Sequence, residues 1–378
     1  MKLKTCSLLV CLTLGVHSSL GWSNDRFSTD IYPVHLKTHA DSLAHPWSLA
    51  FLPEGGILVT ERPGRLRLIE EGILLDRPVE GVPEVAASGQ GGLLDIALHP
   101  AFEENRWLYL SFSDRTAEGL TTRVIRARYQ DGRLTDHEDI FEALPRSSGG
   151  RHFGGRLLFD RAGYLYLSVG DRGEMDRAQD LADHAGSIIR LHDDGRIPDD
   201  NPFVDNPQAK PEIYSWGHRN PQGLVLHPET GDIWSHEHGP RGGDEINLIK
   251  PSLNYGWPKA THGINYTGFS ISPHQTLPGM ESPLLYWTPS IAPSGITFYT
   301  GDDFPEWQGQ LLSGALSHRL VSRVSIDSAQ QPESVVEVEQ MFKGLGRRIR
   351  DIRQDAEGRL WLLTDESPGR VMSIHLNE

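Results

Sequence analysis

The chain alternates short apolar runs with turn residues, and three kinds of run recur six times in the same order. A first strand ends in a turn, a second strand usually begins after a glycine, and a third strand follows a further loop. No segment of useful length shows the period of an amphipathic helix. The pattern therefore predicts an all-β protein. The second-strand copies are GGILVTE, RWLYLSF, GYLYLSV, GDIWSHE, GQLLSGA and GRLWLLT.

Six copies give roughly 60 residues each, which is the size of a four-stranded propeller blade with one long loop. Sheets of this size cannot bury both faces alone and must pack against neighbours around an axis. We therefore expect an all-β, six-bladed β-propeller with four-stranded antiparallel blades, built as one domain from residues 22–378. A large β-sandwich is the alternative, and the regular order of the copies favours the propeller. The inserts at 172–183, 201–211 and 255–283 are expected to be loops on one rim, where propellers place their sites.

Residues 1–21 have the pattern of a secretory signal peptide: basic MKLK, apolar CSLLVCLTLGV, then the small-residue stretch HSSLG. We expect cleavage near Gly21 and a periplasmic or secreted protein. Membrane insertion is not expected, because no later segment approaches roughly 20 continuous apolar residues. Cys6 and Cys11 both lie in this segment, so the mature chain has no disulfide. A lipoprotein role for Cys11 is the less favoured alternative, since its neighbours are not small.

The charge balance narrows the function classes. The 378 residues include 51 acidic and 36 basic side chains, for a net charge of -15. This balance argues against a general nucleic-acid or anionic-membrane surface, so clusters of arginine stand out. No C-x-x-C-H haem motif is present, and no G-x-G-x-x-G follows a strand, which argues against a bound haem and a nicotinamide cofactor.

The stretch WSHEHGPRGGDE, residues 234–245, first suggests zinc, because histidine and glutamate are common zinc ligands. His236 and His238 are only two apart in a strand pattern, however, and a helix-breaking Gly-Pro pair follows, so the H-E-x-x-H signature is absent. Backbone carbonyls of such a turn beside the carboxylates of Asp244 and Glu245 suit Ca2+ better. On this stretch alone, a solvated acidic turn without metal remains an open alternative.

Seven segments follow one another in a recognisable order: GQGGLLDIALHPAF, HFGGRLLFDRAGYLYLSVGDRG, WGHRNPQGLVLHPETG, EHGPRGGDEINLI, NYGWP, PSIAPSG and RIRDI. Their order and spacing resemble those of soluble pyrroloquinoline quinone (PQQ)-dependent sugar dehydrogenases, and most closely the aldose sugar dehydrogenase branch. The resemblance covers nearly all of the chain after the signal segment. It implies a six-bladed propeller with the quinone at the channel mouth and Ca2+ between the cofactor and the backbone.

The resemblance also implies metal ligands. Gly239 and Pro240 match the positions whose carbonyls hold the calcium at the cofactor. Glu245 and Tyr255 match ligands of a second, structural calcium. In this interpretation the two histidines of the stretch are bystanders of the loop.

PQQ carries three carboxylates and an electrophilic quinone, so its pocket needs fixed cations. Arginine suits carboxylates because its planar fork binds them bidentately. Arg348 and Arg350 alternate onto one face of a strand, while Arg347 is expected to point elsewhere. A solvated strand face is the alternative for this pair. Cofactor contacts implied by the family pattern are Gln90, Arg219 and Asn220.

His152 matches the family's general base, the residue expected to take the proton from the anomeric hydroxyl of the sugar. Asp171 matches a region that contacts sugar, although a turn-capping aspartate is the simpler interpretation. The sequence departs from the family at Ser317, where a cofactor-contacting lysine is usual. Losing that cation weakens cofactor binding unless the neighbouring Arg319 replaces it, so we count both as candidate cofactor contacts.

We therefore expect an exported enzyme that oxidises aldoses at C1 to lactones and passes electrons to an external acceptor, as a monomer or a homodimer. One alternative is a calcium-dependent propeller hydrolase such as a lactonase, in which the metal and His152 activate water. That alternative leaves the arginines of GHRN and RRIRD unexplained. Another is a non-catalytic sugar- or protein-binding propeller, if Ser317 has abolished the redox chemistry.

Overall fold

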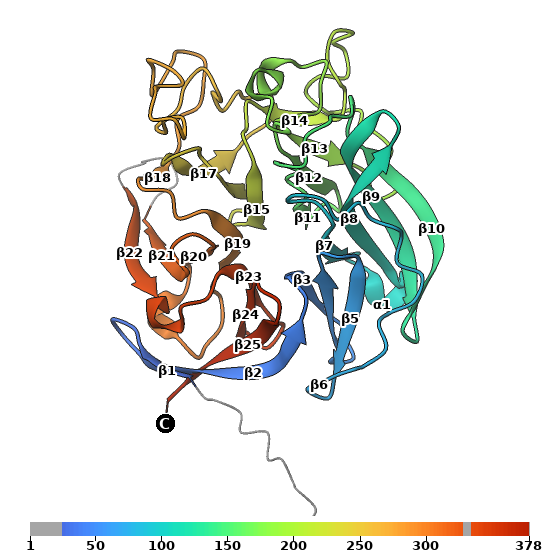
Figure 1. Ribbon diagram of the computed structural model, residues 1–378, viewed down its shortest axis with the longest axis vertical. Helices are drawn as coiled ribbons and strands as arrows, with labels where there is room; N and C mark the ends of the chain where they lie inside the picture. The colour runs from blue at the N-terminus through green and yellow to red at the C-terminus, as the bar shows by residue number, and fades with distance from the viewer. Residues whose placement is uncertain (1–24, 328–333, 378) are drawn as a thin grey trace, which may run out of the picture.

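The computed structural model describes residues 25–327 and 334–377 and shows a six-bladed β-propeller (Figure 1). The predicted fold is confirmed: five blades are four-stranded antiparallel sheets, and the sixth has five strands. The signal peptide predicted at residues 1–21 lies outside the described residues. None of the helices in the described part of the chain is long and apolar enough to span a bilayer.

The strands follow one another from the axis outward in each blade, and Figure 1 shows the first strand of each blade nearest the centre. The first three blades are β3 (Pro46–Phe51), β4 (Ile57–Glu61), β5 (Arg65–Glu70) and β6 (Ile73–Leu74); β7 (Leu93–Leu98), β8 (Trp107–Thr116), β9 (Gly119–Gln130) and β10 (Arg133–Glu142); and β11 (Leu157–Phe159), β12 (Leu165–Val169), β13 (Ser187–Leu191) and β14 (Ile213–Trp216).

Blades four and five are β15 (Pro221–Leu226), β16 (Ile233–Glu237), β17 (Asp244–Ile249) and β18 (Leu285–Trp287), then β19 (Pro293–Phe298), β20 (Leu311–Ala315), β21 (Leu320–Ile326) and β22 (Val335–Met341). The sixth consists of β23 (Ile349–Gln354), β24 (Leu360–Thr364), β25 (Gly369–Leu376), β2 (Pro33–Leu43) and β1 (Asp25–Ser28). The helical segments are α1 (Phe102–Asn105), η1 (Met175–Gln179), η2 (Pro305–Trp307) and η4 (Lys343–Leu345).

The two ends of the described chain close the ring. Strand β2 pairs with β25 over a long antiparallel register that includes Val34 opposite Leu376 and Leu36 opposite Ile374. The outer part of the sixth blade is therefore N-terminal while its inner strands are C-terminal. Backbone hydrogen bonds between the ends of the sequence thus hold the last blade in the ring.

The apolar core lies between blades. Each of six clusters of buried side chains joins strands of two neighbouring blades. Trp234 of blade four, for example, meets Phe298 of blade five edge to face, with ring centroids 5.8 Å apart. The interfaces are apolar because each sheet is covered on both faces, which explains why the strands have buried residues at successive positions.

The inner strands of five blades carry a β-bulge at the end where the cavity lies. In β3, β15 and β23 the register against the second strand skips one residue, namely Trp47, Gln222 and Arg350. Similar shifts occur in β7 and β19. A bulge redirects a side chain without ending the strand. Here it turns the skipped residues toward the channel, and all three line the cavity described below.

Candidate active site

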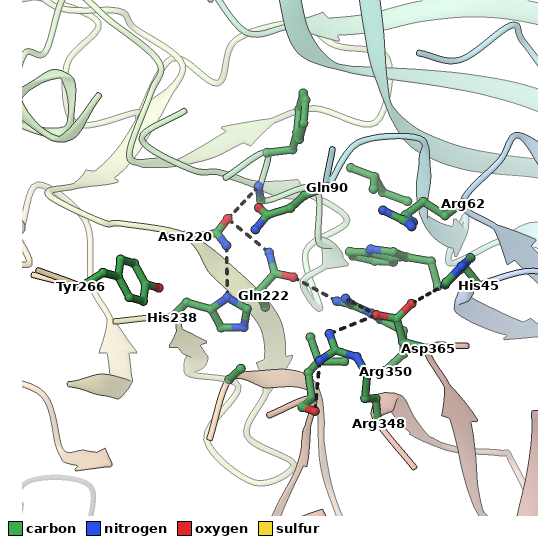
Figure 2. A pocket seen from close by; sticks show the side chains of 16 residues that line it. His45, Arg62, Gln90, Asn220, Gln222, His238, Tyr266, Arg348, Arg350 and Asp365 are labelled. Atoms are coloured by element: carbon green, nitrogen blue, oxygen red, sulfur yellow. Dashed lines mark hydrogen bonds and ion pairs between the residues drawn. The ribbon is translucent and has the colours of Figure 1, made fainter. Parts of the chain in front are cut away.

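A cavity of about 530 Å³ opens at the channel mouth, and all six blades contribute to its wall. Figure 2 shows a charged group of side chains on one side and an amide-rich group on the other. The lining residues are His45, Trp47, Arg62, Gln90, Leu94, Phe153, Gly154, Asn220, Gln222, His238, Tyr266, Ala292, Leu316, Arg348, Arg350 and Asp365.

The charged group is cationic although the protein is acidic. Three guanidinium groups, of Arg62, Arg348 and Arg350, face a single carboxylate, that of Asp365. Arg348 and Arg350 each donate to Asp365 Oδ2, at 3.3 and 3.4 Å. Although burial alone raises the pKa of Asp365, these arginines and His45 hold it well below its usual value. Because one carboxylate cannot balance three cations, the wall favours an anionic guest.

Arg350 is the most confined of these cations. It is buried, and it donates to Gln222 Oε1 at 3.2 Å from the next part of the wall. Burial lowers its pKa, and the nearby Arg156 and Arg348 add to the effect while Asp365 opposes it. Its Nε has no hydrogen-bond partner in the described structure. A buried cation in this state gains from an additional anionic partner.

The floor of the channel is an ion network. Trp47 is near two guanidinium groups, with Arg156 Cζ at 4.3 Å and Arg350 Cζ at 5.5 Å from its ring centroid. Below it, Arg156 and Arg353 share the fully buried carboxylates of Asp95 and Asp351. This network joins blades two, three and six across the axis and fixes the bottom of the cavity.

The amide-rich side is a chain of hydrogen bonds. Asn220 accepts from the backbone N–H of Gly154 at 3.2 Å and donates to His238 Nδ1 at 3.4 Å. His238 Nε2 donates to the carbonyl of Pro293 at 2.7 Å, so the ring is the neutral Nε2–H tautomer. Burial, with Arg219 and Arg350, lowers its pKa well below the usual value. His238, which the sequence suggested was a bystander, thus belongs to the cavity wall.

His152 stands beside the lining residues Phe153 and Gly154, with its ring held from behind. Its Nδ1 contacts Asp171 Oδ1 at 2.6 Å, and no hydrogen bond to Nε2 is found among the described residues. Burial lowers the pKa of His152, the bond to Asp171 partly opposes this, and the nearby Arg219 and Arg151 lower it further. The imidazole is therefore neutral near pH 7 and able to accept a proton.

Asp171 is buried behind the histidine, and its oxygens are occupied. Besides His152, it accepts from Gly173 N at 2.6 Å and from Trp257 Nε1 at 2.8 Å. Although burial favours the neutral acid, His152, the Gly173 N–H and the nearby Arg219 hold the pKa of Asp171 below its usual value. The structure places this carboxylate where it orients the imidazole, and the sequence did not anticipate that arrangement.

Arg219 lies next to the cavity without lining it. Its Nη1 donates to the carbonyls of His238 at 3.0 Å and Gly239 at 2.7 Å. The turn is anchored by Asp244, whose carboxylate accepts from Gly239 N at 2.8 Å. Any Cβ at Gly239 would lie 2.3 Å from the backbone of Gly243, so only glycine fits there. The Gly239 carbonyl therefore has a fixed direction and a lone pair still available.

Glu245 and Glu237 occupy opposite positions on β17 and β16. Burial and the charge of Glu237 raise the pKa of Glu245 well above its usual value. Such a carboxylate pair is a favourable environment for a hard cation. The Tyr255 hydroxyl is already used, because it donates to Leu248 O at 2.6 Å and accepts from Lys250 N at 2.9 Å. The group of Tyr255 that remains to ligate a metal is its backbone carbonyl.

The zinc interpretation gains no geometric support. His236 Nε2 and His238 Nε2 reach carbonyls of the neighbouring blade, those of Gly295 and Pro293. Within residues 25–327 and 334–377 no cluster of three or more histidine, cysteine or acidic side chains is arranged to hold a metal. A calcium ion at these positions would instead rely on backbone carbonyls with one or two carboxylates.

Two candidate residues do not line the cavity. Ser317 and Arg319 are exposed in the turn between β20 and β21, and Arg319 donates to Gly346 O at 3.0 Å. Arg347 also points elsewhere, as expected, and pairs with Glu366. The preceding Leu316 does line the cavity, and its carbonyl accepts from Arg348 at 3.3 Å.

The inserts differ in their relation to the site. Residues 255–283 supply Trp257 and Tyr266, and residues 172–183 continue directly from Asp171. Residues 201–211 supply no lining residue and pack on Arg190 of β13 through Asn201. Sequence reasoning missed several lining residues, among them His45, Trp47, Arg62, Gln222, Tyr266 and Asp365. Of these residues, only Asp365 could have been suspected from the sequence, because it directly follows one of the predicted second strands.

The glucose/sorbosone dehydrogenase family model matches residues 43–373, so the chain belongs to that family. Among curated relatives, the chain is 44% identical over 347 residues to aldose sugar dehydrogenase YliI of Escherichia coli (strain K12), covering 90% of this chain and 92% of the relative. These matches confirm, at the level of the family, the resemblance found in the sequence. They also confirm the predicted enzyme class, a PQQ-dependent type of sugar dehydrogenase.

Two solved structures are similar over nearly the whole described chain. The apo form of the soluble aldose sugar dehydrogenase of Escherichia coli matches with a TM-score of 0.88 and 43% identity, covering 91% of this chain and 100% of that chain. The PQQ-bound form of an aldose sugar dehydrogenase from Streptomyces coelicolor matches with a TM-score of 0.75 and 28% identity, covering 91% and 98%.

Proposed function

We propose that this protein oxidises aldoses at C1 to lactones with PQQ as cofactor, and that it works outside the cytoplasm with an external electron acceptor. The observation that carries the proposal is the cationic cavity beside the His152–Asp171 pair. Three guanidinium groups against one carboxylate suit a polyanionic cofactor. A free imidazole nitrogen beside them suits proton removal.

The residues present fit the quinone. Arg348, Arg350 and Arg62 would bind its carboxylates, while Gln90 and Asn220 would hold its polar edge from the opposite wall. The contacts of Arg348 and Arg350 with Asp365 are long, at 3.3 and 3.4 Å. A bound carboxylate could therefore replace Asp365 at these arginines with little rearrangement. When bound, PQQ with Ca2+ supplies a polarised two-electron acceptor for the hydrogen at C1 of the sugar.

The protein's own residues perform the proton chemistry. His152 Nε2 accepts the proton of the anomeric hydroxyl as C1 loses its hydrogen with two electrons, and the C1–O bond becomes the lactone carbonyl. Asp171 keeps the proton of the resting imidazole on Nδ1, so that Nε2 has the free lone pair. Its negative charge then stabilises the imidazolium that forms.

Calcium fits two places. The carbonyls of Gly239 and Pro240 would hold the ion at the cofactor, where the fixed turn and the adjacent Asp244 favour a hard cation. Glu245 and the backbone of Tyr255 would hold the second ion, which would neutralise the Glu237–Glu245 pair.

Reconstitution tests the proposal. Purified protein is treated with chelator, then given Ca2+, PQQ or both, and reduction of a redox dye is followed with several aldoses. We expect dye reduction only when both are present, and its loss in His152→Gln with PQQ binding retained. Lactone hydrolysis without PQQ would identify a hydrolase instead, and sugar binding with neither activity would identify a binding protein.

A further inference from the structure

Arg172 is a buried cation without an ion-pair partner in the described part of the chain. It lies in the turn between β12 and β13, with 3% of its surface exposed. Its guanidinium covers the face of Phe153, with Cζ 3.5 Å from the ring centroid. Burial lowers its pKa to about 10. Burying a cation without a counter-charge costs free energy, so its hydrogen bonds must offset that cost.

Those hydrogen bonds go to the loop that carries His152. Arg172 Nη2 donates to Gly149 O at 2.7 Å, and Nη1 donates to Arg151 O. On the other side of the same peptide bond, the N–H of His152 donates to Gln90 Oε1 at 2.8 Å. Both polar atoms of the peptide between residues 151 and 152 are thus held, which fixes the plane of that peptide.

The plane of this peptide determines the backbone angle of His152, which is unusual. His152 has φ 53°, in the left-handed region that residues other than glycine rarely adopt. Backbone of this kind persists when its surroundings hold it in place, and it is concentrated at functional sites. If the peptide turned, the imidazole would lose its contact with Asp171.

One tripeptide therefore holds His152 in two ways. Asp171 binds the ring, and Arg172 binds the backbone that precedes it. Gly173 completes the arrangement, because its N–H donates to Asp171 and because a Cβ at this position would lie 2.4 Å from Arg151 Nε. The side chain of Arg151 thus lies across the same turn.

We propose that Arg172 is a positioning residue for His152, one that fixes the 151–152 peptide so that the imidazole keeps its direction toward the substrate hydroxyl. The inference rests on the proposed role of His152 as base. It assigns no contact with sugar or cofactor to Arg172 itself.

Three variants test it. Arg172→Met keeps the length of the side chain and loses its donors, and Arg172→Lys keeps the charge with one donor group. The matched control is Arg161→Met. Arg161 also donates to two backbone carbonyls, of Glu229 at 3.2 Å and of Pro228, but lies exposed at a turn away from the cavity.

The first readout needs no cofactor. In the apoprotein, amide hydrogen exchange of residues 147–155 is expected to accelerate about tenfold or more in Arg172→Met, because the loop opens locally. It should stay unchanged in Arg161→Met, where residues 226–232 should respond instead. Unchanged exchange at 147–155 in Arg172→Met would overturn the proposal.

The second readout is kinetic. With bound PQQ, Arg172→Met is expected to lower kcat about 10- to 100-fold, the size expected for a misplaced base, while PQQ affinity changes little. The acid limb of kcat should move to higher pH, because an opened loop relieves the burial that lowers the pKa of His152. Arg172→Lys should recover part of kcat.

The outcomes separate this inference from the function on which it rests. If His152→Gln retains turnover, His152 is not the base, and the exchange experiment still decides whether Arg172 holds the loop. If His152→Gln is inactive while Arg172→Met keeps full kcat, only the positioning role fails. Equal losses of kcat and PQQ affinity with an unmoved acid limb would assign Arg172 to general stability and overturn the proposal. Should Arg172→Met fail to fold, the same measurements on Arg172→Lys decide.

Discussion

At the scale of single residues, the site depends on a neutral histidine with a defined free nitrogen. Burial keeps His152 neutral, and the carboxylate of Asp171 keeps its proton on Nδ1. The two effects act on the pKa in opposite directions, since burial lowers it and the carboxylate raises it. Proton removal therefore becomes effective as the pH rises through a pKa below the usual histidine value.

Asp171→Asn tests this balance. Removing the carboxylate leaves burial and Arg219 to lower the pKa of His152 further, so the acid limb of kcat should move to lower pH. The maximal kcat should fall about 100-fold or more, because the imidazolium loses its partner. The profile is measured between pH 4 and pH 8 with saturating sugar. An acid limb displaced to higher pH would contradict the argument.

At the scale of elements, the short inner strands aim the site through their bulges. The bulge in β23 turns Arg350 into the channel, while Arg347, before the strand, points outward to Glu366. Neighbouring arginines of one segment thus have different surroundings, and this provides a matched pair for experiment.

Arg350→Met should weaken PQQ binding about 10- to 100-fold, which corresponds to the loss of one charge-assisted contact. Arg347→Met should leave binding unchanged. Titration of the apoprotein with PQQ, followed by recovered activity or by fluorescence, measures both. Equal affinities of the two variants would exclude Arg350 from the cofactor site.

The turn between β20 and β21 carries the departure from the family pattern. Ser317 is exposed, and the adjacent Leu316 lines the cavity. A lysine at 317 has the length to place an ammonium near the cofactor, so Ser317→Lys should raise PQQ affinity or kcat. Because Arg319 is bound to Gly346, we expect no compensating cation in the unsubstituted protein. The same PQQ titration, with Ser317→Gln as the uncharged control, checks this, and equal effects of both variants would contradict it.

At the scale of the whole molecule, the blades are held by apolar interfaces on the outside and by an ion network at the axis. Asp95 is fully buried and accepts from Arg156, Arg353, Ser48 and the N–H of Leu157. These partners come from different blades, so the carboxylate joins parts that are far apart in the sequence.

Asp95→Asn should lower the free energy of unfolding by about 3–5 kcal/mol, because the buried guanidinium of Arg156 and the partly buried one of Arg353 lose a shared counter-charge. Glu54→Gln is the control. Glu54 pairs with Arg106 at the surface, where such a pair contributes about 0–1 kcal/mol. Urea unfolding followed by tryptophan fluorescence compares the two. Similar midpoints for both variants would show that the axial network contributes little.

The periodic sequence by itself determined the blade count, the order of the first three strands in each blade, and the family. These features depend on local patterns that repeat along the chain. Arg348, Arg350, Gln90 and Asn220 were also found from motifs, and all four line the cavity. The roles proposed for them stay predictions.

Only the tertiary structure decided which other residues meet at the cavity. Trp47 and Gln222 are turned inward by bulges, and a two-residue strand period gives no sign of a bulge. Asp171 joins His152, and Asp365 joins Arg350, only because the ends of neighbouring strands converge at one end of the channel. The pairing of β2 with β25 could not be predicted from the sequence either. A strand pattern specifies which side chains share a face, but the hydrogen-bonding partner of an outer strand is determined only when the ring closes.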